Sequence, residues 1–201
     1  MKNKISLLRN VSAAALMMAA IPAALAATSS SDFTTEPDKS MAAAHESFLK
    51  GDMQKASASI DKAAAGVKKE SDKVAASAKD GVKKAGDDLK KLGQSVKSGA
   101  VKSDDELKKT FAQVDHALAK AWHATAQESM KGGKDTSNAL KKAGESLSGA
   151  AKWSGTELKK AAQSSLNAAK KVGQGIKAGG EDVKKWFQDI GNGIKDVERK
   201  L

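Results

Sequence analysis

Few side chains in this sequence could do chemistry, and the three histidines come first. His116 and His123 lie seven residues apart, so on a helix they would share one face, about 10 Å apart along the axis. Two ligands of one metal ion on a helix need a spacing of four residues, and no cysteine or acid stands at ligand spacing beside them. We therefore expect structural histidines, His45 included, and no metal site. Their titration near pH 6 would make stability pH-dependent.

No catalytic group and no cofactor site is predicted. The chain has no cysteine, and its serines lie in runs of alanine, serine and lysine. Neighbouring acids such as Asp104 and Asp105 point to different sides of a helix. The glycine-rich stretch 173–180 follows no predicted strand and so is not a phosphate loop. We expect a protein that is not an enzyme.

The first 26 residues have the form of a secretory signal peptide. Basic residues precede an apolar run that ends at Ala24-Leu25-Ala26, a small-x-small cleavage signal. A membrane anchor is the alternative, but the run is shorter than a span of about 20 residues and Pro22 interrupts it. Cleavage near Ala26 would place the mature chain in the periplasm or outside the cell. It would remove three positive charges from a net charge of +11.

The rest of the chain is predicted to be all-α. Alanine, lysine and serine dominate, both prolines precede residue 38, and no stretch alternates with the period of a strand. Without cysteines the fold must hold by packing alone, and it cannot be a lipid-anchored lipoprotein. We expect a flexible leader over 27–36 and an elongated, coiled-coil-like bundle of antiparallel helices over 37–201, built as hairpin repeats 37–100 and 104–201.

Capping signals place the ends of several helices. The first helix is expected to follow a Thr35 cap and to end at Gly51 in the left-handed conformation, after which Asp52 caps the next helix. Ser103 opens a capping box for a further helix that ends near Gly132. The apolar face of this helix carries Leu107, Phe111, Val114, Leu118 and Trp122.

Two long helical rods are expected, one over 53–98 and one from about residue 136 to Gly179. Their apolar residues recur near every seventh place and form narrow seams bordered by glycine and alanine, which let helix backbones approach closely. We therefore expect the seams to contact another helix, of this chain or of a second copy. The seam residues are Val82, Leu89, Leu92, Val96, Ile176, Val183, Phe187, Ile190, Ile194 and Val197.

The chain also repeats itself weakly, because "ESFLKGDMQKASASIDKAA" (46–64) parallels "ESMKGGKDTSNALKKAGESL" (128–147). The piece that contains the first copy, "AHESFLKGDMQKASASIDKAA" (44–64), resembles the first hairpin of the YfdX family of small exported bacterial proteins. It also resembles a tetratricopeptide-type hairpin. The resemblance implies a helical fold linked to stress tolerance, with no agreed enzymatic activity. The lysine-rich segments 65–102 and 150–201 depart from that family. The matching residues of the tetratricopeptide-type hairpin are Gly51, Asp52, Ala56, Ile60 and Ala63.

Positive charge is concentrated in residues 136–180, where eight lysines face two acids. This segment could attract an acidic polysaccharide or an anionic lipid, although a solvated helix face explains the pattern better. Export argues against a nucleic-acid partner. The candidate anion contacts are Lys141, Lys142, Lys159, Lys160, Lys170 and Lys171.

The last segment, 181–201, is the best membrane candidate. Lys184, Lys185, Trp186 and Phe187 resemble an interfacial anchor. However, its basic and acidic residues balance and its apolar stripe is narrow, so a partner helix is favoured over lipid.

These patterns together predict a non-enzymatic exported protein of the bacterial cell envelope. It would act through helix–helix contacts with another helical protein or with itself, in a stress-related or chaperone-like role. A lipid-binding protein of apolipoprotein-like or desiccation-protein-like behaviour is the alternative, and a binder of acidic polysaccharide is a third.

Overall fold

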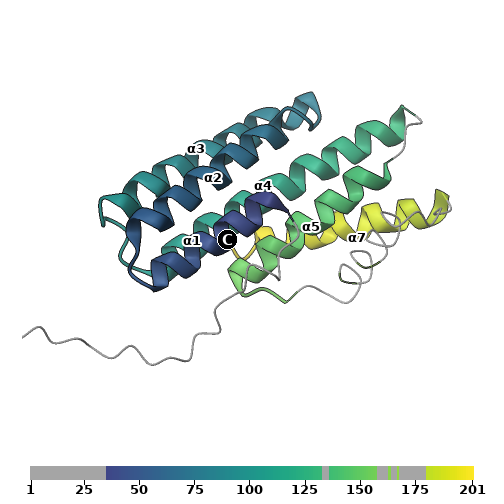
Figure 1. Cartoon of the computed structure of the whole chain (residues 1–201). Coiled ribbons are helices and arrows are strands. Elements are labelled where there is room, and N and C mark those ends of the chain that lie inside the picture. The colour runs from purple at the N-terminus through teal and green to yellow at the C-terminus, as the bar shows by residue number, and fades with distance from the viewer. Residues whose placement is uncertain (1–34, 133–135, 158–162, 164–166, 168–179) are drawn as a thin grey trace, which may run out of the picture.

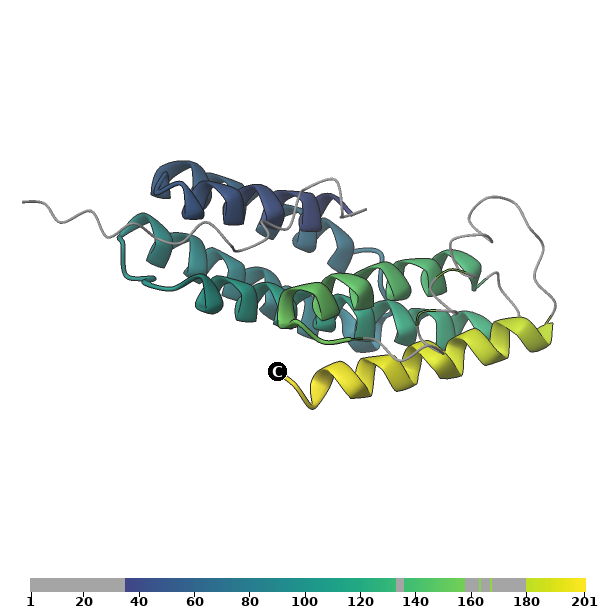
Figure 2. The same cartoon turned by 90° about the horizontal axis from the view of Figure 1, so that it is seen from below.

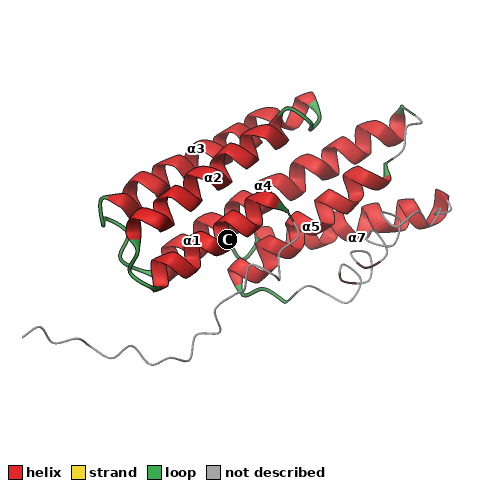
Figure 3. Ribbon diagram, viewed as in Figure 1, coloured by secondary structure: helices red, strands yellow, loops and turns green. Residues whose placement is uncertain are grey.

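The computed structural model describes residues 35–132, 136–157, 163, 167 and 180–201. The described residues form six α-helices and one short 3-10 helix, with no strand among them (Figure 3). The predicted all-α fold is therefore confirmed, while residues 1–26, predicted to be a signal peptide, lie outside the described residues. The elements are α1 (Glu36–Leu49), α2 (Met53–Ser71), η2 (Ala76–Ala78), α3 (Lys79–Lys97), α4 (Asp104–Lys131), α5 (Ser137–Ser154) and α7 (Gly180–Glu198).

Helix α4 is the centre of the bundle. It packs against α1, α3, α5 and α7, and α2 packs against both α1 and α3. Figure 1 shows α2 and α3 side by side at one edge of the molecule and α5 with α7 at the other. Figure 2 shows α1 and α7 on opposite sides of the layer formed by α4 and α5. Among the described helices, none combines the length and apolarity needed to cross a bilayer.

The helix ends follow the capping signals of the sequence. The Asp38 backbone N–H donates to Thr35 Oγ1 at 3.2 Å. Gly51 has φ +76°, the left-handed conformation that glycine adopts without strain. The Lys55 N–H donates to Asp52 Oδ1 at 3.0 Å, so Asp52 caps α2 as expected.

Helix α4 also starts and packs as the sequence indicates. The Glu106 N–H donates to Ser103 Oγ at 3.3 Å. The expected apolar face of α4 is buried in the core, and the residues concerned are Leu107, Phe111, Val114, Leu118 and Trp122.

The prediction of one rod over 53–98 is wrong. Helix α2 ends at Ser71, and the chain turns back through η2 into α3, which packs along α2. A single straight helix would have left its narrow seam uncovered, whereas folding back buries one half of the seam against the other. The turn itself is held on α4, because the Ala75 N–H donates to Thr125 Oγ1 at 2.8 Å.

Small residues let α2 and α3 approach closely, as the seam pattern predicted. A Cβ atom built on Gly86 would lie 3.7 Å from Val67 Cγ1, and one built on Gly93 would lie 3.0 Å from Asp61 Oδ1. A larger side chain at Gly86 would therefore push the two backbones apart.

The second expected rod is also wrong, because α5 ends at Ser154. Gly155 has φ +63°, its N–H donates to the Lys152 carbonyl at 3.3 Å, and the Thr156 N–H donates to the Ala151 carbonyl at 2.9 Å. These two bonds are a Schellman ending, which a glycine after the last turn favours. Most of the expected continuation to Gly179 lies outside the described residues, and α7 begins at Gly180.

Candidate functional site at the α4–α7 interface

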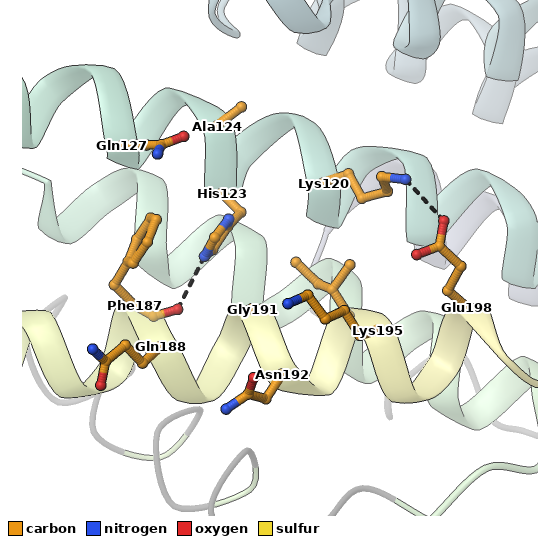
Figure 4. A pocket seen from close by; sticks show the side chains of 11 residues that line it. Lys120, His123, Ala124, Gln127, Phe187, Gln188, Gly191, Asn192, Lys195 and Glu198 are labelled. Atoms are coloured by element: carbon orange, nitrogen blue, oxygen red, sulfur yellow. Dashed lines mark hydrogen bonds and ion pairs between the residues drawn. The ribbon is translucent and has the colours of Figure 1, made fainter.

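Two histidines of α4 contact the backbone of α7. The His116 Nε2 atom lies 3.2 Å from the Ile194 carbonyl oxygen, and the His123 Nε2 atom lies 2.9 Å from the Phe187 carbonyl oxygen (Figure 4 shows the second contact). A carbonyl only accepts, so each imidazole donates from Nε2. The two histidines are seven residues apart on α4, and the two carbonyls are seven residues apart on α7. The helices run antiparallel, so a single alignment of α7 along α4 forms both contacts.

The surroundings of His123 explain how α7 comes so near. Its ring stacks on the Phe187 ring with centroids 3.9 Å apart and an interplanar angle of 18°. A Cβ atom built on Gly191 would lie 3.0 Å from His123 Nε2, closer than side-chain carbons normally pack. Gly191 therefore leaves the space that the imidazole occupies between the two helices.

An ion pair near His116 also links α4 and α7. Lys120 Nζ lies 3.0 Å from Glu198 Oε1, and both side chains are about half exposed, at 53% and 52%. Figure 4 shows the pair bridging α4 and α7. Exposed pairs of this kind contribute roughly 0–1 kcal/mol, so the two imidazole contacts are the more specific link between the helices.

A groove of about 630 Å³ runs along this interface. Figure 4 shows Gln127 and His123 on its α4 side and Phe187, Asn192 and Lys195 on its α7 side. Its volume falls in the range of small-molecule sites. Its lining combines amide groups, two lysines and a glutamate with one stacked aromatic pair. Because α7 forms one side of the groove, the groove depends on α7 remaining in place.

Burial shifts the pKa of both histidines. For His116, desolvation lowers the pKa and outweighs the opposite effects of Glu198 and the Ile194 carbonyl, while Lys120 lowers it further. For His123, desolvation again lowers the pKa and outweighs the hydrogen bond to the Phe187 carbonyl, with Lys195 adding to the decrease. Both rings therefore favour the neutral form at the interface.

A second polar cluster lies inside the bundle, where Asp38 of α1 and Asp115 of α4 meet. Their exposed fractions are 1% and 0%. Burial raises the pKa of both carboxyl groups, and the nearby Asp38 carboxyl raises that of Asp115 further. Two carboxyl groups in one buried site share a proton rather than ionise together. The α5 backbone covers them, because a Cβ atom built on Gly149 would lie 2.9 Å from Asp115 Cγ.

His45 belongs to the same region. Its Nε2 atom hydrogen-bonds with one oxygen of the Asp104 carboxylate, and the other oxygen pairs with Lys108. The His45 ring meets the edge of Trp153 at a centroid distance of 5.6 Å, and Phe111 meets the same indole at 5.1 Å. This cluster therefore ties α1, the start of α4 and α5 together.

Sequence reasoning missed the acid pair. Neither Asp38 nor Asp115 was singled out from the sequence. The available signal was spacing: Asp115 lies four residues after Phe111 and three before Leu118, which places it on the apolar face of α4.

The seam residues of α3 and those near the end of α7 lie in the core, whereas Val183 and Phe187 are half-buried and Ile176 lies outside the described residues. The buried seam residues are Val82, Leu89, Leu92, Val96, Ile190, Ile194 and Val197.

The candidate anion contacts do not gather into a described site. Lys142 donates to Glu70 Oε2 at 2.8 Å and lies 4.2 Å from the centre of the Trp122 ring, while Lys141 is half-buried. The remaining four, Lys159, Lys160, Lys170 and Lys171, lie outside the described residues.

The candidate membrane contacts all lie on α7. Lys184 and Lys185 are exposed, and Trp186 and Phe187 are half-buried.

No protein-family model, curated protein or solved structure matches this chain. Within the described ranges, no three histidine, cysteine or acidic side chains come together as metal ligands.

Proposed function

We propose that the mature chain is a non-enzymatic exported protein of the bacterial cell envelope that binds other helical proteins by exchanging α7 for a partner helix. The observation that supports this is the way α7 docks. It lies against α4 and α5, and the buried residues Ile190, Ile194 and Val197 form its contact stripe. A partner helix with apolar residues at the same spacing would cover the same face of α4 and α5.

The proposed role is chaperone-like and stress-related. The signal-peptide pattern of residues 1–26 supports export, and the resemblance of residues 44–64 to the YfdX family supports a link to stress tolerance. Because α7 is a surface helix of this bundle, its displacement would expose apolar surface while leaving α1 to α5 joined through α4.

The direct test adds α7 in trans. A fluorescent peptide of residues 180–201 is titrated with the full mature chain at neutral pH, and binding is followed by fluorescence anisotropy. We expect saturable binding. Its apparent affinity should be lower than the affinity of the peptide for a vacant site, because the resident α7 occupies the site most of the time. The matched control peptide carries Ile190→Ser, Ile194→Ser and Val197→Ser and should not bind. Absence of binding by the natural peptide would contradict the proposal.

A lipid surface is the second candidate partner, and one observation favours it. Lys184 and Lys185 are exposed beside the half-buried Trp186, an arrangement suited to an anionic interface. Co-sedimentation with phosphatidylglycerol vesicles tests this, with Lys184→Glu/Lys185→Glu as the variant. Binding that requires both lysines would support the lipid partner, whereas equal sedimentation of the variant would exclude it.

A further inference from the structure

We propose that His116 and His123 form an acid-sensitive clasp that holds α7 on the bundle at neutral pH and releases it in mild acid. The inference rests on the proposed function, since both make α7 the part that moves, but it goes further by naming what controls the movement. The structural basis of the proposal is the pair of contacts that the two histidines make with carbonyl groups of the α7 backbone.

The register of the two contacts makes them act together. His116 meets the Ile194 carbonyl and His123 meets the Phe187 carbonyl, so two turns of α4 match two turns of α7. Gly191 lies between these carbonyls in the sequence, and its missing side chain provides the space for the His123 ring. A shift of α7 along α4 by even one residue would break both hydrogen bonds at once.

The charged side chains around the two rings would not neutralise the positive charge of a protonated imidazole. Among the described residues, the charged groups that act on the imidazoles are Lys120 of α4 and Lys195 and Glu198 of α7. The two lysines repel an imidazolium. Glu198 attracts one, but its carboxylate already binds Lys120 at 3.0 Å. A protonated ring at this interface is therefore desolvated without a dedicated counter-ion.

The pKa directions agree with this geometry. Both histidines have a pKa below the ordinary value of 6.5 when α7 is docked, chiefly because of burial. Released rings return toward the ordinary value, so protons bind the released state more strongly. The stabilisation of docking is fully present above about pH 6.5 and is lost as the pH falls toward the lowered values.

The interior of the bundle responds to pH in the opposite sense. Burial raises the pKa of Asp38 and Asp115, so their folded state binds more protons than the unfolded chain. The stability that these groups contribute is present at low pH and lost as the pH rises through their folded pKa values. Mild acid therefore weakens the contact of α4 with α7 while favouring the contact of α1 with α4.

Hydrogen exchange of the full mature chain, read by mass spectrometry, tests the clasp. Protection is compared at about pH 7.5 and about pH 5 after correction for the intrinsic exchange rate. Between pH 6.5 and 5, protonation of each histidine can change the equilibrium constant between docked and released α7 by at most roughly 30-fold, because each pH unit corresponds to a tenfold change. We expect protection of α7 to fall at least tenfold, and protection of α2 and α3 to change by less than about threefold.

Two variants separate titration from hydrogen bonding. In His116→Gln/His123→Gln, the amide nitrogen can still donate to the carbonyl but does not titrate, so the acid-induced loss of α7 protection should disappear. His45→Gln removes the third imidazole, in α1, and should leave the α7 response as it is in the natural chain.

The proposal is overturned if α7 protection does not depend on pH in the natural chain, or if the double glutamine variant keeps the dependence. The hydrogen-exchange experiment tests the clasp and needs no added helix. The peptide titration tests the replacement of α7 and needs no change of pH. Failure of the clasp and failure of helix replacement are therefore seen in different experiments.

Discussion

Replacing Gly149 by alanine tests the packing of α5 over the buried acid pair. The new Cβ atom would lie 2.9 Å from Asp115 Cγ and 3.5 Å from Asp38 Oδ1. Neither carboxyl group can move into solvent, because their exposed fractions are 0% and 1%. Overpacking of a core of this kind costs about 1–3 kcal/mol, whereas alanine in place of glycine in a helix gains up to about 1 kcal/mol.

The net expectation is a loss of about 1–2 kcal/mol in the free energy of unfolding, equivalent to a melting temperature lower by roughly 2–8 °C for a chain of this size. The assay is urea denaturation followed by far-UV circular dichroism. The matched control is Gly81→Ala in α3, where no atom lies within 4 Å of the added Cβ, and it should be stabilised by about 0.5–1 kcal/mol.

A double mutant identifies the group responsible. In an Asp115→Ala background, the Gly149→Ala change should lose most of its cost, because the atom that it meets is gone. If Gly149→Ala is as stabilising as Gly81→Ala, or if its cost is unchanged without the Asp115 side chain, the described contact between α4 and α5 is refuted.

Three further predictions concern the bundle. Burial raises the Asp115 pKa above its ordinary value of 3.8, so the natural chain should lose stability as the pH rises through the folded pKa. Asp115→Asn cannot ionise and should flatten this part of the urea-measured stability curve, so parallel curves would contradict the prediction. At Gly86, where a Cβ would lie 3.7 Å from Val67, alanine should add about 0.5–1 kcal/mol but leucine should cost about 1–3 kcal/mol; equal melting temperatures would argue against close packing of α2 on α3. Ser103→Ala removes the cap that accepts from Glu106 and should cost about 1 kcal/mol, whereas Ser103→Asp should restore most of the loss in thermal melts.

Several local features could be predicted because they depend on residues close in sequence. The Asp52 cap contacts an N–H three residues away, and the Gly51 ending requires only a residue that accepts positive φ. The heptad spacing likewise identified Leu89 and Ile190 as core positions, since a helix places such residues on one face whatever lies opposite.

Other features needed the whole fold. The same valine and leucine spacing suits one long rod or two helices folded back on each other. Tertiary contacts distinguish them, among them those of Ala75 with Thr125 and of Gly86 with α2. The helix was expected to continue past Gly155 to Gly179, because a glycine inside a helix and a glycine after a last turn look alike in sequence.

The sequence by itself determined that this chain is helical, where most of its helices begin, and which face of each is apolar, because hydrogen bonds and side-chain periodicity within a few residues decide these properties. Only the tertiary structure decided which faces meet. His116 lies 78 residues from Ile194 and His123 lies 64 residues from Phe187, so their contacts, like the meeting of Asp38 with Asp115, follow from the simultaneous packing of several helices around α4.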